Sequence, residues 1–98
     1  MNVYIVDYCA NEFDDISHDR PYPIYISLDK DKAYDFFNDC VQKEIDIFNK
    51  LLKEHQEYRN NEDWQIVINE ENHFKIYRGN WEYEYVFDEF EFDIDLRY

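Results

Sequence analysis

The feature that most constrains the fold of this chain is a change in the spacing of its apolar residues. Between residues 30 and 57, apolar side chains recur three and four positions apart, which predicts one long amphipathic helix. Ser27 or Asp29 can cap its N-terminus. In three later segments the apolar residues instead alternate with polar ones, the pattern of β-strands with one buried face. These segments are residues 64–69, 73–78 and 81–87.

Two earlier segments, residues 3–10 and 23–28, are rich in β-branched and aromatic side chains and also predict strands. Gly79 and Asn80 predict a tight hairpin between the last two strands, because both residues tolerate a positive φ. The expected fold is therefore α+β, with one long helix packed on an antiparallel sheet of five or six strands in the order ββαβββ. A chain of 98 residues is expected to form a single domain, residues 1–98.

The stretch EYEYVFDEFEFDID, residues 82–95, alternates acidic and apolar side chains. Its apolar residues occupy odd positions up to Phe87 and even positions from Phe90, so the alternation slips by one residue at Asp88–Glu89. Such a slip predicts a β-bulge, or a bend before a sixth strand, because an unbroken strand would turn the later acids toward the core.

The acids after this slip are expected to share one strand face at intervals of about 6.6 to 6.8 Å, and they are Glu89, Glu91, Asp93 and Asp95. Successive phosphates of a nucleic acid strand lie roughly 6 to 7 Å apart. Acids that face solvent also keep a sheet soluble, which is the ordinary explanation. Residues 82–98, however, carry seven acids and one base, and like charges on one strand face are destabilising. We therefore hypothesise that these carboxylates imitate phosphates.

Two other groups of acids are candidates for the same surface. Asp31, Asp35 and Asp39 recur every four residues along the first half of the predicted helix, although acids near a helix N-terminus are also favoured by its dipole. The loop after the first strand contributes Asp14 and Asp15. The complete predicted partner-binding set is Glu82, Glu84, Asp88, Glu89, Glu91, Asp93, Asp95, Asp31, Asp35, Asp39, Asp14 and Asp15.

The charge of the chain limits its partners. Twenty-four acids against ten Lys and Arg residues give a formal net charge of -14, which repels nucleic acid and anionic membranes. With 45% hydrophobic residues the chain is too apolar to be a disordered acidic tail. The complementary partner is a basic protein.

Motifs for catalysis or cofactor binding are scarce. The only glycine is Gly79, so no phosphate-binding glycine loop is available. The segment DDISHD could gather Asp15, His18 and Asp19 around a divalent ion, but this is a generic cluster. We expect no enzymatic activity, no catalytic residue, no metal and no cofactor.

The cysteines and the N-terminus indicate the compartment. Cys9 and Cys40 lie in apolar segments and are expected to be reduced core thiols. The first ten residues, MNVYIVDYCA, lack the basic region and the long apolar region of a signal peptide. A cytoplasmic protein is expected.

A very small, acidic, aromatic-rich domain in which VYIVDY is followed by IYISLDKDKAYDFFND and an acidic meander resembles small phage-encoded anti-defence proteins. These include anti-CRISPR proteins and other DNA mimics. They share no common fold, so the resemblance assigns no residue roles. It implies that the protein acts in the host cytoplasm as an anti-CRISPR or anti-restriction protein. It would do so by occupying the basic nucleic-acid groove of a CRISPR effector or another host nuclease.

A second hypothesis is a protein–protein binding or accessory module without mimicry, including a homodimer formed through an exposed edge of the last strand.

Overall fold

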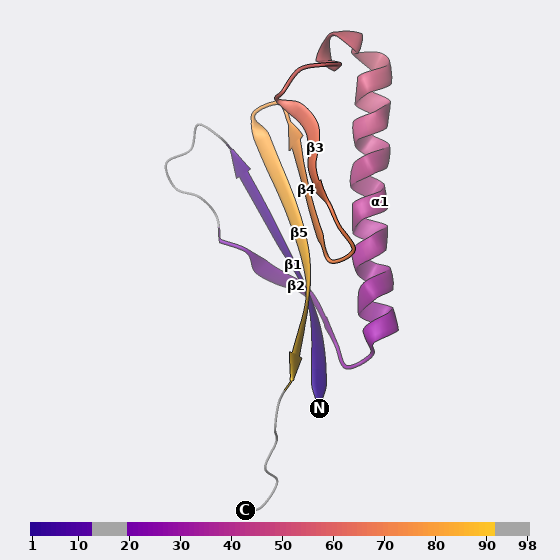
Figure 1. The fold of residues 1–98 in the computed structure, drawn as a ribbon, viewed down its shortest axis with the longest axis vertical. Helices are drawn as coiled ribbons and strands as arrows, with labels where there is room; N and C mark the ends of the chain where they lie inside the picture. Colours follow the sequence, from indigo (N-terminus) through magenta and orange to yellow (C-terminus); the bar gives the residue numbers. More distant parts are fainter. Residues whose placement is uncertain (13–19, 92–98) are drawn as a thin grey trace, which may run out of the picture.

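The computed structural model describes residues 1–12 and 20–91. Strands β1 (Asn2–Glu12) and β2 (Tyr22–Ser27) precede helix α1 (Lys30–Glu54) and the short 3₁₀ helix η1 (Gln56–Tyr58). Strands β3 (Trp64–Asn69), β4 (His73–Arg78) and β5 (Trp81–Glu91) follow. The five strands form one antiparallel sheet in the order β2-β1-β5-β4-β3 (Figure 1). The predicted α+β fold and its ββαβββ order are confirmed, with five strands in the described part of the chain.

Helix α1 begins where the sequence places a capping residue. Asp29 is the N-cap, and its carboxylate accepts hydrogen bonds from the backbone N–H groups of Asp31 (3.0 Å) and Lys32 (3.2 Å). Ser27, the other predicted cap, supports this turn by accepting a hydrogen bond from the Asp29 N–H at 2.9 Å. The helix ends at Glu54, three residues earlier than predicted, because the chain continues as η1.

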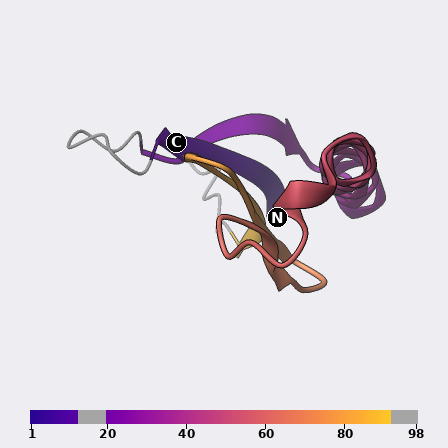
Figure 2. The ribbon, with the colours of Figure 1, turned by 90° about the horizontal axis from the view of Figure 1, so that it is seen from above.

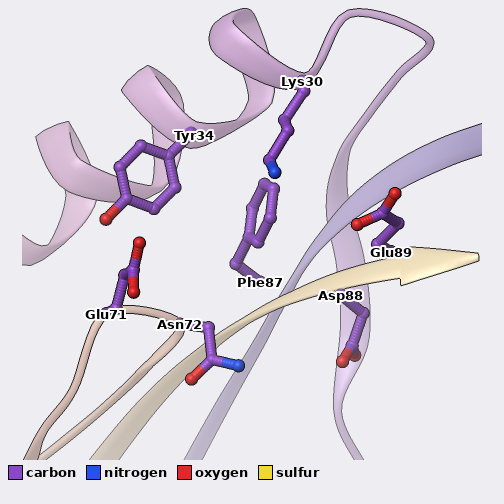
Figure 3. Close-up of a pocket in the computed structure, with 7 residues that line it drawn as sticks. All are labelled: Lys30, Tyr34, Glu71, Asn72, Phe87, Asp88 and Glu89. Carbon is purple, nitrogen blue, oxygen red and sulfur yellow. The ribbon is translucent and has the colours of Figure 1, made fainter.

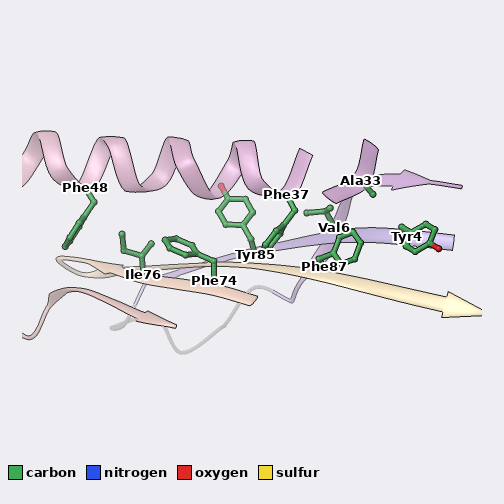
Figure 4. Close-up of a cluster of buried hydrophobic side chains, with 9 residues drawn as sticks. All are labelled: Tyr4, Val6, Ala33, Phe37, Phe48, Phe74, Ile76, Tyr85 and Phe87. Atoms are coloured by element: carbon green, nitrogen blue, oxygen red, sulfur yellow. The ribbon is translucent and has the colours of Figure 1, made fainter. Parts of the chain in front are cut away.

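The core lies between α1 and one face of the sheet (Figure 4). Viewed from above, the helix lies to one side of the curved sheet (Figure 2). Full burial of a large apolar side chain contributes about 1.5 to 3 kcal/mol, so these contacts hold the helix on the sheet. The buried cluster consists of Tyr4, Val6, Ala33, Phe37, Phe48, Phe74, Ile76, Tyr85 and Phe87.

The two-residue hairpin predicted at Gly79 and Asn80 is present, with Arg78 paired to Trp81 across it. Gly79 has a φ of 66°, whereas Asn80 is not among the described residues with positive φ. A Cβ added at Gly79 would also lie 3.4 Å from the Trp64 ring. Glycine is therefore required at the first turn position only.

The predicted bulge or bend at Asp88–Glu89 is wrong. Strand β5 pairs with β1 without interruption from Trp81 opposite Glu12 to Glu91 opposite Asn2. Glu89 and Glu91 thus continue the same face as the buried Tyr85 and Phe87, and yet they are exposed. Both strands run past the start of α1 at this end, so no helix covers these positions (Figure 1). The length of the strands, rather than a bulge, keeps the acids out of the core.

The homodimer expected through an exposed edge of the last strand stays a prediction, because the structure describes this strand only as far as Glu91. β5 is a central strand that lies between β1 and β4, and the edge strands of the described sheet are β2 and β3. Its pairing with β4 ends at Val86 opposite His73, so beyond that point β1 is the only strand of the described residues that pairs with it. A sixth strand would fall in residues 92–98, which lie outside the described residues.

Cys9 and Cys40 form no disulfide with each other, as expected from the sequence. Cys9 is buried and Cys40 is partly buried on α1. Burial raises the pKa of the Cys40 thiol, which favours its unreactive protonated form.

Candidate functional site

An acidic cavity of about 320 Å³ lies where the start of α1, the β3–β4 turn and the end of β5 meet (Figure 3). Glu71 and Glu89 lie on opposite sides of this cavity, and Tyr34 and Phe87 supply aromatic walls. Lys30 is its only basic lining residue among those described. Further side chains extend the acidic surface along β5. We call Glu71, Glu89 and Glu91 the acidic end.

Two members of the acidic end retain the spacing predicted for a phosphate-like array. Glu89 and Glu91 are exposed, two residues apart on one strand, and lie on the same face. The Asn2 amide donates a hydrogen bond to Glu89 Oε1 at 2.9 Å, which orients that carboxylate without neutralising its charge. Asp93 and Asp95, the other members of the predicted array, lie outside the described residues.

The earlier acids of β5 point to the opposite face and have partners. The carboxylate of Glu82 forms an ion pair with Lys75 at 2.6 Å, and that of Glu84 contacts His73 Nε2 at 2.6 Å. The hydrogen bond to Glu82 raises the pKa of Lys75. Glu82 and Glu84 are partly buried, so they are less suited than Glu89 and Glu91 to contact a partner as free charges.

Asp88 shares that opposite face with Asp7 of β1. Burial, the negative charge of Asp88 and a side-chain hydrogen bond to Asp88 all raise the pKa of Asp7. Because Asp7 opposes Val86 and Asp88 opposes Ile5, the two carboxyl groups are diagonal neighbours on adjacent strands. They form a carboxyl pair in place of an acid–base pair.

The helix supplies a separate group of acids. Asp31, Asp35 and Asp39 are all exposed on α1, as the four-residue spacing predicts. Asp31 also lies in the first helical turn, where the dipole favours a negative charge. Asp14 and Asp15 lie outside the described residues, as does the DDISHD segment.

One charged cluster was not predicted. Glu44 is buried on α1, where it accepts a hydrogen bond from the Tyr85 hydroxyl at 3.1 Å and lies 3.4 Å from Arg78 Nη2. The Arg78 guanidinium in turn lies over the Tyr83 ring, 4.3 Å from its centre. Burial and the Glu44 charge raise the pKa of Tyr85, and the same two causes raise that of Tyr8 to about 12.

The sequence does contain a signal for this cluster. Glu44 lies four residues before Phe48 and seven after Phe37, on the apolar stripe of the helix. Arg78 follows Phe74 and Ile76 at the alternate positions of β4 that face the helix. Two opposite charges at core-facing positions predict a buried ion pair.

Within residues 1–12 and 20–91, no group of three or more His, Cys, Asp or Glu residues is arranged to hold a metal ion. In the same residues, no helix is sufficiently long and apolar to cross a membrane.

Comparison with family models, curated protein sequences and solved structures gives no match for this chain.

Proposed function

We propose that this protein is a non-enzymatic inhibitor that binds a basic nucleic-acid-binding protein and presents carboxylates in place of phosphates. The proposed targets are CRISPR effectors, restriction systems and other host nucleases. A phage or mobile element is the expected source of such an inhibitor, and the host cytoplasm is its expected site of action.

The observation that carries this proposal is that, among the described residues, few acids form an ion pair with Lys or Arg. Among the described residues, only two Lys or Arg side chains form ion pairs, and both Lys75 and Arg78 are partly buried in the sheet. The exposed acids of the acidic end and of α1 therefore remain available to a partner. A surface that served solubility alone would function equally well with mixed charges.

The acidic end is better suited to this role than the rest of β5. Glu89 and Glu91 repeat at twice the strand rise, about 6.6 to 6.8 Å, which approximates the phosphate interval. Tyr34 and Phe87 line the adjacent cavity and could contact the aliphatic part of a bound lysine or arginine. Long-range charge would then steer association, and short-range packing would slow dissociation.

The proposal can be tested with two variants of equal net charge. One replaces Glu71, Glu89 and Glu91 by Gln, and the control replaces three exposed acids near the other end of α1 by Gln. The control residues are Glu54, Glu57 and Glu62. Immobilised wild-type protein and both variants are incubated with bacterial lysate at about 50 and 500 mM salt, because attraction between exposed charges is screened over this range.

We expect the wild type and the control to retain a DNA-binding protein at low salt, to lose most of it at high salt, and to release it when duplex DNA is added. The Glu71, Glu89 and Glu91 variant should retain much less. Equal retention by the two variants would show that net charge alone attracts the partner. Retention of a protein that duplex DNA fails to release would contradict mimicry.

A further inference from the structure

The face of the sheet opposite α1 is not covered by any helix in the described part of the chain (Figure 4). The register places alternate residues of β1 and β5 on this open face, next to the exposed Ile26 of β2. One corner of it combines apolar side chains with the Asp7–Asp88 carboxyl pair. We call this corner the open-face patch, and it consists of Val3, Ile5, Asp7, Ile26, Val86, Asp88 and Phe90.

The acids of the open-face patch have a different kind of neighbour from the acids on the adjoining part of the same face. There, Glu82 is paired with Lys75 and Glu84 with His73. Asp7 and Asp88 are the two remaining acids that β1, β4 and β5 place on this face, and each has the other carboxyl group as its neighbour. Two carboxylates side by side favour a positive charge from outside.

Large apolar side chains beside this pair are exposed to solvent. Ile26 is 60% exposed and Phe90 is 44% exposed, although both are large hydrophobic residues. Ile5 lies between Ile26 and Asp88 in the register, and Val3 is opposite Phe90. In protein-binding hot spots, the contacts around the central ones exclude water. The apolar side chains beside Asp7 and Asp88 could exclude water from a partner's contact with the two carboxyl groups in the same way.

We propose that the open-face patch binds a partner protein that places an arginine side chain against Asp7 and Asp88 and apolar side chains against Ile26 and Phe90. Arginine fits better than lysine because its planar guanidinium can donate hydrogen bonds to two carboxyl groups at once. Nucleic acid is repelled by these acids, and a second copy of a chain with net charge -14 would bring acids of its own. This contact does not depend on phosphate mimicry by the acidic end.

The test is selection of binders from a random peptide display library against the folded protein. We expect the selected peptides to contain an arginine next to aliphatic or aromatic residues. Their affinity should fall about tenfold or more when Asp7 and Asp88 are both replaced by Asn, since loss of a desolvated charge pair has at least this effect. Ile26→Ser should also weaken binding. The control replaces Glu54 and Glu57 by Gln, changes the net charge equally and should leave the affinity unchanged.

A peptide with its arginine replaced by Ala completes a mutant cycle. It should bind the wild type weakly and lose little further affinity on the Asn variant, because the two changes remove the same contact. Binders without a basic residue, binders indifferent to Asp7 and Asp88, or a library without binders to this face would overturn the proposal. So would a wild-type dimer, measured by sedimentation, that Ile26→Lys dissociates, because the patch would then be occupied by a second copy. Circular dichroism and melting of each variant separate lost contacts from lost folding.

Discussion

Replacing Glu44 or Arg78 by Leu tests whether the buried ion pair determines how α1 sits on the sheet. Glu44 is 8% exposed, and its carboxylate is held by the Tyr85 hydroxyl and the Arg78 guanidinium. Either single replacement leaves one charge in a desolvated position without its counter-charge. Breaking a buried pair in this way costs about 3 to 5 kcal/mol, against a total stability of about 5 to 15 kcal/mol for a typical domain.

The partial exposure of the Arg78 side chain places the expected loss of stability in both single variants near the lower end of that range. The Arg78 side chain is 17% exposed and can regain some water, so Glu44→Leu should cost about 3 kcal/mol, including the hydrogen bond lost by Tyr85. Arg78→Leu leaves a more deeply buried carboxylate and should cost about the same or slightly more. The double variant removes both charges and should cost only about 1 kcal/mol, mainly for the unpaired Tyr85 hydroxyl.

Urea unfolding of the four proteins at pH 7 measures these differences as shifts of the midpoint at constant slope. We expect the two single losses together to exceed the loss in the double variant by at least about 2 kcal/mol. Additive losses would refute the argument, because they would mean that the charges of Glu44 and Arg78 do not depend on each other in the folded state.

Three smaller predictions concern the fold. Asp29→Ala should lower the free energy of unfolding by about 1 kcal/mol because α1 loses its cap, whereas Asp29→Asn should have little effect; chemical denaturation measures both. The raised pKa of Asp7 means that the native state binds more protons than the unfolded state, so its destabilising effect is present above the folded pKa and disappears as pH falls. Asp7→Asn should therefore raise the melting temperature at pH 7 and lose this advantage at acid pH, and an advantage independent of pH would count against the carboxyl pair with Asp88. Gly79→Ala should destabilise by about 1 kcal/mol or more because alanine is strained at a φ of 66° and contacts Trp64; an unchanged melting temperature would contradict this.

The fold was predictable because its signals are local. The three- and four-residue spacing between residues 30 and 57 identifies the helix, and the two-residue alternation around Gly79 identifies the meander. The end of α1 at Glu54 was less predictable, since η1 continues with similar composition and helix ends are set by short-range backbone contacts.

The error at Asp88–Glu89 has a different physical origin. Alternation indicates which side chains share a face, but it does not indicate how far a strand extends beyond the helix that covers it. The pairing of Asn2 with Glu91, close to both ends of the chain, is what places the acidic end beyond the core. A contact between residues so distant in sequence carries no local signal.

The acidic residues of the candidate site could be predicted from the sequence, but their arrangement in space could be predicted only in part. Exposure of Asp31, Asp35 and Asp39 follows from helical spacing. The pairing of Glu82 with Lys75 and the meeting of Glu71 with Glu89 at one cavity depend on the order of strands in the sheet. The sequence does not give that order directly.

The most direct test of phosphate mimicry is competition with DNA for the same partner. A nucleic-acid-binding protein captured by this chain is loaded with a fluorescent duplex, and the anisotropy of the duplex is followed as the chain is added. We predict complete displacement of the duplex, with an apparent affinity that falls steeply as salt rises and is weakened by the Glu71, Glu89 and Glu91 to Gln variant. A stable ternary complex, in which the duplex stays bound while the chain saturates its partner, would contradict the proposed function.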